Sequence, residues 1–318
     1  MIFVEDYIDE DVAYLLGMIA AKGSLSESGG QKQIVIEFPF VNLSVEGISS
    51  SFDQETAITV GLVGIQKRLQ ELLETSIDIV DKPNSKELVA RFQRKNMMWR
   101  NIITLTGGST THHTFQIPEI MFNPALPTDY KREFIKGYGD VAGNIRASNN
   151  FMNEVNRVRL DVMNANWKLP VQLCLLLQNE IGVSVQMVQW GHPNTRGKKG
   201  NPFKEHQIQI FAKEYGKVGF NFPHKQKILE EFIEADFRNE PNFNYKGCPG
   251  RKILKTSKEV DPKENDSNLP VELKGKHFNS YWQICKELGC TREPASNGQL
   301  SLLDLAIAED DNNLPIEE

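Results

Sequence analysis

The sequence predicts an α+β fold made of two copies of one α-β-β-α-β-β-α unit, followed by a small C-terminal extension. The same order of helical and strand patterns occurs twice along the chain, and an apolar helix opens each copy. Matched positions lie at similar offsets. Gly23 and Gly143 are 120 residues apart, as are Glu87 and Gln207, whereas Ser76 and Ser184 are 108 apart. These observations divide the chain into repeats at 1–128 and 129–247 and an extension at 248–318.

The first repeat opens with a helix over residues 9–22, whose apolar residues follow helical spacing and which ends at Gly23. Alternating apolar residues then predict two pairs of strands separated by a long helix. Residues 81–86, which include Pro83 and Asn84, have the composition of a hairpin turn. The elements expected after the first helix are strands 24–28 and 33–38, helix 54–73, strands 76–80 and 87–93, and helix 96–105.

The second repeat follows the same order. Its first helix ends at Gly143, and residues 157–162 alternate between polar and apolar side chains as a half-buried strand does. The expected elements are helix 130–141, strand 157–162, helix 169–181, strands 184–189 and 207–212, and helix 225–237.

The two opening helices share a pattern of small residues. The first ends in LLGMIAAKG and the second in IKGYGDVAG, so each has one glycine near its middle and one at its end. A glycine inside a helix costs about 1 kcal/mol relative to alanine, so it usually serves packing. We therefore expect the two helices to cross at close backbone approach through their small residues, which are Gly17, Ala20, Ala21, Gly137, Gly139 and Ala142.

These two motifs, each opening a matched repeat, resemble the LAGLIDADG homing endonuclease family in its single-chain, two-repeat form, over about residues 9–240. The resemblance implies that the motif helices pack at the centre. It also implies that two antiparallel sheets form a saddle over duplex DNA, with strands in the major groove. Members of the family are deoxyribonucleases that use a divalent metal, usually Mg²⁺, held by one acid at the eighth position of each motif.

The sequence departs from the family at these eighth positions, which are Lys22 and Ala142 and supply no carboxylate. Mg²⁺ requires oxygen ligands. Asp140 lies two residues before Ala142 and points about 200° away around a helix, so we interpret it as a helix-end or interfacial acid, with a metal-binding acid as the alternative. Lys22 can instead contact the phosphate that a metal would approach. We therefore expect no metal site and no cofactor, with Mg²⁺ needed only if the chain is an endonuclease.

If the sheets form such a saddle, strand alternation identifies the side chains that face the DNA. In the first repeat these are Ser24, Ser26, Gln33, Arg91 and Gln93, with the acids Glu37, Asp78 and Glu87. In the second repeat they are Arg146, Arg157, Arg159, Gln186, Gln207 and Gln209, with Asn144 and Asp161. Their neighbours along each strand are apolar, as a sheet backed by helices requires. Because Arg, Gln and Asn can make bidentate contacts with guanine or adenine, this composition favours base readout over an ordinary solvated face.

Residues 192–204 join two strands of the second repeat and carry four positive charges and no acid. We expect Arg196, Lys198, Lys199 and Lys204 to contact phosphate, where charge neutralisation gives affinity without sequence preference. A solvated hairpin tip is the alternative.

The composition is that of a globular protein, with 40% apolar residues, 25% charged residues and a formal charge of −6. This charge excludes a protein that coats nucleic acid through overall basicity, although the middle segment 129–247 carries +4 between flanks of −6 and −4. No apolar run approaches the roughly 18–20 residues of a membrane span, and the acidic N-terminus is unlike a secretory signal. We therefore expect a cytoplasmic protein without a membrane partner. Because both repeats lie in one chain, we expect a monomer.

The extension at 248–318 lies outside the resemblance. It contains a polar linker, an amphipathic aromatic helix over 277–288 and an acidic end over 309–318. We expect the helix to dock on the body of the protein or on a protein partner. Four residues offer a Cys₃His zinc site, but their spacing is poor and no CxxC pair is present, so we expect no zinc. They are Cys248, His277, Cys285 and Cys290.

These observations predict a sequence-specific double-stranded DNA-binding protein that resembles a LAGLIDADG homing endonuclease and lacks metal-dependent cleavage. One alternative is a divergent restriction- or homing-type DNA endonuclease with non-standard metal ligands. Another is a maturase-like RNA-binding protein. The sequence contains no P-loop or dinucleotide fingerprint.

Overall fold

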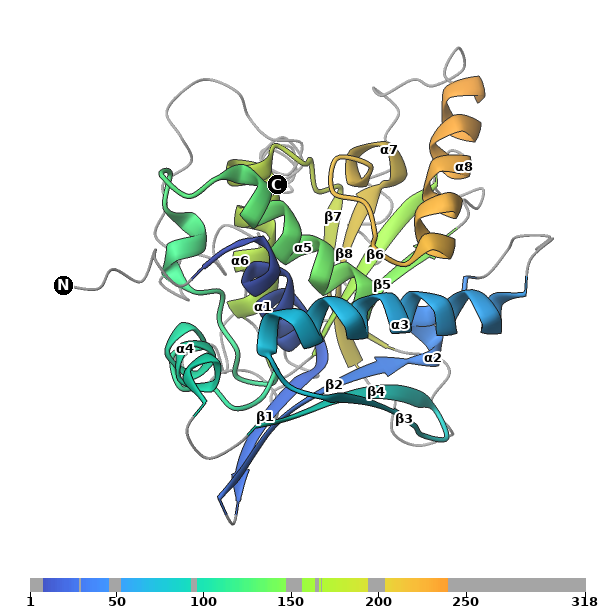
Figure 1. The fold of residues 1–318 in the computed structure, drawn as a ribbon. Coiled ribbons are helices and arrows are strands. Elements are labelled where there is room, and N and C mark those ends of the chain that lie inside the picture. Colours follow the sequence, from blue (N-terminus) through green and yellow to red (C-terminus); the bar gives the residue numbers. More distant parts are fainter. Residues whose placement is uncertain are drawn as a thin grey trace.

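A computed structural model of the chain describes residues 8–28, 30–45, 53–92, 96–146, 156–163, 166, 168–193 and 204–239. These residues form an α+β fold with two four-stranded antiparallel sheets (Figure 1). The elements of the first half are α1 (Glu10–Lys22), β1 (Gly23–Ser28), β2 (Gln31–Pro39), α2 (Phe40–Leu43), α3 (Gln54–Leu73), β3 (Ile77–Asp81), β4 (Ser85–Phe92), α4 (Met97–Leu105) and the 3₁₀ turn η2 (Glu119–Phe122). Those of the second half are α5 (Thr128–Ala142), β5 (Gly143–Arg146), β6 (Arg157–Met163), α6 (Lys168–Leu175), the π-helical segment η4 (Leu176–Ile181), β7 (Met187–Pro193), β8 (Lys204–Phe211), α7 (Ala212–Tyr215) and α8 (Pro223–Asn239).

The helix ends follow from local capping. Asp9 caps α1 because its carboxylate accepts the amide N–H of Val12 at 2.8 Å, and the amide of Gly23 closes the last turn on the carbonyl of Ile19. Asp53 caps α3 in the same way. The described helices include none that is long and apolar enough to cross a membrane.

The two sheets have matching strand orders, β1-β2-β4-β3 and β5-β6-β8-β7. The predicted hairpin turn lies between β3 and β4, where the amide of Lys82 donates to the carbonyl of Ser85 at 2.9 Å. One face of each sheet is apolar and buried beneath helices, which confirms the predicted alternation. The buried side chains of these faces include Ile34, Ile36, Leu88, Phe92, Val158, Leu160, Ile208 and Ile210.

Two strand predictions in the second repeat are wrong at their ends. β7 begins at Met187 rather than Ser184, because the amide of Ser184 donates to the side chain of Glu214 instead of to a strand. β8 begins at Lys204 rather than Gln207, and Ala212 opens α7. The predicted loop 192–204 is therefore shorter, since its first two residues pair with the start of β8 beyond a register shift. The short helices α2 and α7 were not predicted, because four residues are too few for a periodic signal.

The motif helices α1 and α5 cross at the centre of the molecule, with one sheet on either side (Figure 1). A Cβ built on Gly17 would lie 1.9 Å from the carbonyl oxygen of Phe134, and one built on Gly137 would lie 2.1 Å from that of Tyr14. The close approach predicted from these two glycines is confirmed. Gly139 has another role. A Cβ built on it would lie 1.9 Å from the hydroxyl oxygen of Tyr215, so the missing side chain leaves room for this tyrosine.

We expect Gly137→Ala to lower the free energy of unfolding by about 3 kcal/mol or more, because the new methyl group meets a backbone carbonyl that cannot move aside. Urea denaturation followed by circular dichroism measures the change. The matched control is Gly64→Ala on α3, where a Cβ meets nothing within 4 Å. The control should be neutral or more stable by up to about 1 kcal/mol, as expected from helix propensity. Equal effects of the two substitutions would contradict this account of the helix crossing.

Candidate nucleic-acid interface

The two motif helices end at the junction between the sheets, and the strands β1 and β5 follow them without a loop. Lys22, the last residue of α1, is partly exposed, and its Nζ lies 3.5 Å from the sulfur of Met163 at the end of β6. Ala142, the last residue of α5, is fully buried. The family positions for metal ligands thus hold an ammonium group and a methyl group. These residues do not fit Mg²⁺.

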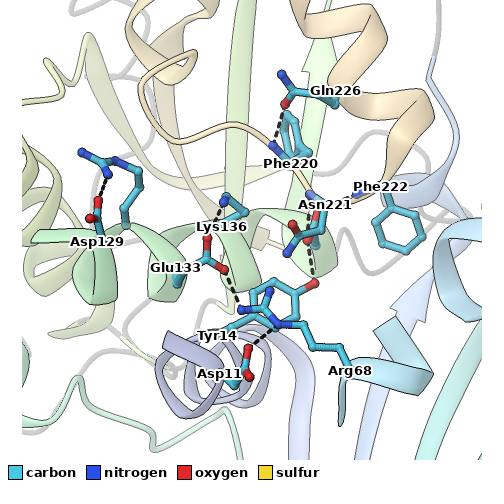
Figure 2. Close-up of polar contacts among 12 residues, drawn as sticks. Asp11, Tyr14, Arg68, Asp129, Glu133, Lys136, Phe220, Asn221, Phe222 and Gln226 are labelled. Carbon is cyan, nitrogen blue, oxygen red and sulfur yellow. Dashed lines mark hydrogen bonds and ion pairs between the residues drawn. The ribbon is translucent and has the colours of Figure 1, made fainter. Parts of the chain in front are cut away.

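Asp140 is buried inside the protein rather than presented to a ligand. Its carboxylate accepts a hydrogen bond from the hydroxyl of Tyr14 at 2.7 Å and from the amides of Asn221 and Phe222 at 3.1 Å and 3.4 Å. Tyr14 belongs to α1, and the two amides precede α8 (Figure 2). Burial raises the pKa of Asp140 to about 6, although the charge of Lys225 and these donors act in the opposite direction. The interpretation of Asp140 as an interfacial acid agrees with these contacts, which leave it unsuited to metal binding.

Arg68 of α3 contacts both motif helices beside Tyr14 (Figure 2). Its guanidinium lies 4.2 Å from the centre of the Tyr14 ring and forms ion pairs with Asp11 of α1 at 2.6 Å and Glu133 of α5 at 2.9 Å. Glu133 also pairs with Lys136. Sequence reasoning missed this contribution of α3, because an arginine on a long helix has no local feature that distinguishes it from a solvated one.

Lys225 of α8 binds the end of α5. Its Nζ donates to the carbonyls of Asp140 at 2.9 Å, Gly143 at 3.0 Å and Gly139 at 3.4 Å, and the side chain is fully buried. A cation is favourable at the C-terminal end of a helix, where carbonyl groups lack partners. Burial lowers the pKa of Lys225 to about 8. This contact spans more than 80 residues and could not be predicted from a local pattern.

A loop after α4 extends the first sheet beside Lys22. The amide of Leu25 donates to the carbonyl of Thr110 at 2.8 Å, and Ser24 pairs with Thr111. The backbone amide and the Nδ1 atom of His112 both lie 3.0 Å from the carbonyl oxygen of Gly23. Burial, with the charge of Lys22 as a smaller cause, lowers the pKa of His112 to about 4, so the ring is neutral at pH 7. The sequence carried no signal for this contact.

The strand register assigns the predicted DNA-facing residues of the first sheet to one face, which we call the first polar face. Directly paired residues share a face, so this face carries Ser24, Ser26, Gln33, Val35, Glu37, Asp78, Glu87, Val89 and Arg91. Ser24 and Ser26 are exposed. Arg91 is also exposed, but it forms an ion pair with Asp78. Gln93 lies outside the described residues.

The second polar face carries Asn144, Arg157, Arg159, Asp161, Met163, Glu205, Gln207 and Gln209, as the register of β5, β6 and β8 shows. Arg157 and Arg159 are partly exposed, whereas Gln207 and Gln209 are only 4% and 5% exposed. Strand alternation thus placed these glutamines on the expected face but did not predict their burial.

Three further residues predicted to contact DNA lie among the described residues, namely Gln186, Arg146 and Lys204. Gln186 lies just before β7, where its amide donates to the carbonyl of Gln209 at 2.8 Å. Arg146 pairs with Arg157 along the backbone, and Lys204 pairs with Pro193. Three further predictions fall outside the described residues, namely the phosphate contacts of the basic loop, the aromatic helix 277–288 and the possible zinc ligands. The loop residues concerned are Arg196, Lys198 and Lys199.

Within the described part of the chain, no group of three or more His, Cys, Asp or Glu side chains is placed to hold a metal ion. The element order of both halves, their matching sheets and the glycine-mediated crossing of the motif helices agree with the family resemblance. The fold is LAGLIDADG-like.

Comparison with known proteins gives similarity to solved structures of the LAGLIDADG type and no match by sequence. No protein-family model matches the chain, and no curated protein matches it. A crystal structure of the homing endonuclease I-DmoI in complex with DNA and Ca is 16% identical and covers 70% of this chain and 97% of its own, with a TM-score of 0.40. Full-length DUF199/WhiA from Thermatoga maritima is 13% identical and covers 99% and 95%, with a TM-score of 0.42. The N-terminal LAGLIDADG domain of DUF199/WhiA is 11% identical and covers 73% and 82%, with a TM-score of 0.35.

The raised pKa of Asp140 predicts a pH effect on stability. The folded chain binds this proton more tightly than the unfolded chain, where the pKa is near 3.8. Protonated Asp140 therefore adds to the free energy of unfolding. This contribution is fully present below about pH 4 and is lost as the pH rises through about 6. Asp140→Asn removes this titration. We expect the fall in the free energy of unfolding between about pH 4.5 and 7 to be about 2 kcal/mol smaller in the variant, as measured by urea denaturation.

The control for this measurement is Asp129→Asn, because Asp129 lies on the same helix with a side chain that is 66% exposed. Its pH profile should follow that of the natural chain. An Asp140→Asn profile that also runs parallel to the natural one would contradict the assignment of the proton to Asp140.

Proposed function

We propose that the chain binds duplex DNA sequence-specifically through the polar faces of its two sheets and does not cleave it by the metal-dependent mechanism of homing endonucleases. The arrangement of the second polar face carries this proposal. There the partly exposed Arg157 and Arg159 lie on one side of an antiparallel sheet whose other side is backed by helices. A two-stranded ribbon fits the major groove, and arginine matches the edge of guanine.

The absence of a carboxylate at the two motif positions, Lys22 and Ala142, supports the second part of the proposal. A metal that stabilises both the attacking and the leaving oxygen of a phosphodiester needs oxygen ligands at this point. Lys22 offers a single cation there, which can neutralise a phosphate and position the DNA. Asp140, the acid nearest in sequence to the second helix end, is already bound by three donors inside the protein.

The first experiment is selection of bound fragments from a random duplex library at near-physiological salt, followed by sequencing. We expect a long enriched motif with two unlike halves, because the two polar faces differ in composition. Weak, salt-sensitive retention without enrichment would overturn sequence-specific binding. The selected duplex is then incubated with Mg²⁺ or Mn²⁺, and sustained strand breakage that depends on an acid near the helix ends would favour the endonuclease alternative. Competition with structured RNA tests the maturase-like alternative.

Lys22 supplies a test of the phosphate contact at the junction of the sheets. We expect Lys22→Ala to weaken binding similarly for all sequences and to reduce the slope of log K against log salt by about 1, since one counterion fewer is released. Fluorescence anisotropy at several salt concentrations measures both quantities. An altered sequence preference with an unchanged slope would contradict a phosphate contact.

The basic loop of the second repeat is tested in the same assay. We propose that Lys198 and Lys199 contact phosphate, so replacing both by Ala should weaken binding across sequences and reduce the salt slope by about 2. The control replaces Lys67 and Lys217, which lie on α3 and in the turn after α7. Equal losses in the two double variants would indicate a general charge effect and would contradict a contact specific to the loop.

A further inference from the structure

The two sheets carry different residues at matching positions next to the motif helices. In each half, the strand after the motif helix starts at a glycine, and the residue after this glycine opens a row of three paired residues across neighbouring strands. We call these rows the first central row, Ser24–Val35–Val89, and the second central row, Asn144–Arg159–Gln209. Val35 and Arg159 therefore occupy equivalent positions in the two halves.

Arg159 is held in place along one edge of its guanidinium. Its Nε lies 3.0 Å from Oδ1 of Asp161 in an ion pair without hydrogen-bond geometry, and its Nη2 donates a hydrogen bond of 3.5 Å to Oδ2. The two residues are two positions apart on β6 and thus share a face. Asp161 is itself fixed, because Oδ2 also accepts hydrogen bonds from the Nδ2 atoms of Asn144 at 2.7 Å and Asn42 at 3.3 Å. Asn42 lies on α2, so the first half of the chain helps to hold this carboxylate.

This arrangement leaves the other edge of the guanidinium available. The Nη1 atom has no hydrogen-bond or ion-pair partner among the described residues, and 20% of the Arg159 side chain is exposed, compared with 6% for Asp161. A guanidinium fixed in advance loses less conformational entropy when it binds. Two N–H groups in a planar fork match the O6 and N7 acceptors of guanine in the major groove. A phosphate contact does not require such fixed orientation.

We propose that Arg159, positioned by Asp161, reads a guanine in one half of the DNA site. The equivalent Val35 has no hydrogen-bonding side chain, so the other half-site has no guanine preference at the matching base pair. An apolar side chain there suits the methyl group of thymine. The inference rests on the proposed function, since it names the base that the second polar face recognises.

The test compares Arg159→Lys with the natural chain on the duplex selected from the random library. Lysine keeps the charge but lacks the planar fork. We expect the natural chain to prefer guanine by about 10-fold to 100-fold at one base pair, and the variant to lose this preference while it keeps its salt dependence. Substituting 7-deazaguanine at that base pair, which removes the N7 acceptor, should weaken binding of the natural chain and leave binding of the variant unchanged.

Val35→Ala is the matched control, because it changes the equivalent position of the other half. It should leave the guanine preference unaltered. Asp161→Asn, checked for an unchanged circular dichroism spectrum, should reduce the preference without abolishing binding, which is the effect of a positioning residue.

Two results would overturn the inference while the proposed function stands. One is an Arg159→Lys variant that keeps the full guanine preference. The other is an equal loss of affinity for every base at that pair, which is the behaviour of a phosphate contact. A natural chain that enriches no duplex sequence would instead remove the proposed function and this inference with it.

Discussion

The close contact between the backbones of α1 and α5 is the constraint on which the rest of the structure depends. The carbonyl of Phe134 fills the space beside Gly17, and the carbonyl of Tyr14 fills the space beside Gly137. Two such contacts fix both the distance and the angle between the helices. Because β1 and β5 start directly at the ends of these helices, the crossing also sets the separation of the two polar faces.

A crossing this tight buries polar groups that must be satisfied, and their partners come from elements distant in sequence. Asp140 takes donors from Tyr14 on α1 and from the residues that precede α8, and Lys225 takes the open carbonyls at the end of α5. Arg68 of α3 adds a further link by pairing with both motif helices. The acid of the second motif therefore stabilises the junction between the halves instead of facing a ligand.

The two halves have the same strand order, but their polar faces carry different residues at equivalent positions. On the first polar face Glu37 and Glu87 lie directly opposite each other. The two carboxylates repel each other, and both repel phosphate. On the second polar face the equivalent pair is Asp161 and Gln207, and the acid is neutralised by Arg159. One half thus carries more donors than the other, which is the basis of the proposed DNA site with unlike halves.

The sequence by itself determined most of the helices and strands, their order along the two halves and the contact between the motif helices. Apolar periodicity and capping residues act over one or two turns, so the bounds of α3 and the end of α1 at Gly23 could be read locally. The tertiary structure alone decided what fills the junction, including Lys225 beneath α5, Asn42 beside Asp161 and the burial of Gln207. The hydrogen bonds of Lys225 and Asn42 join residues that are 82 to 119 positions apart. They depend on how the elements pack, and no short-range pattern in the chain records that packing.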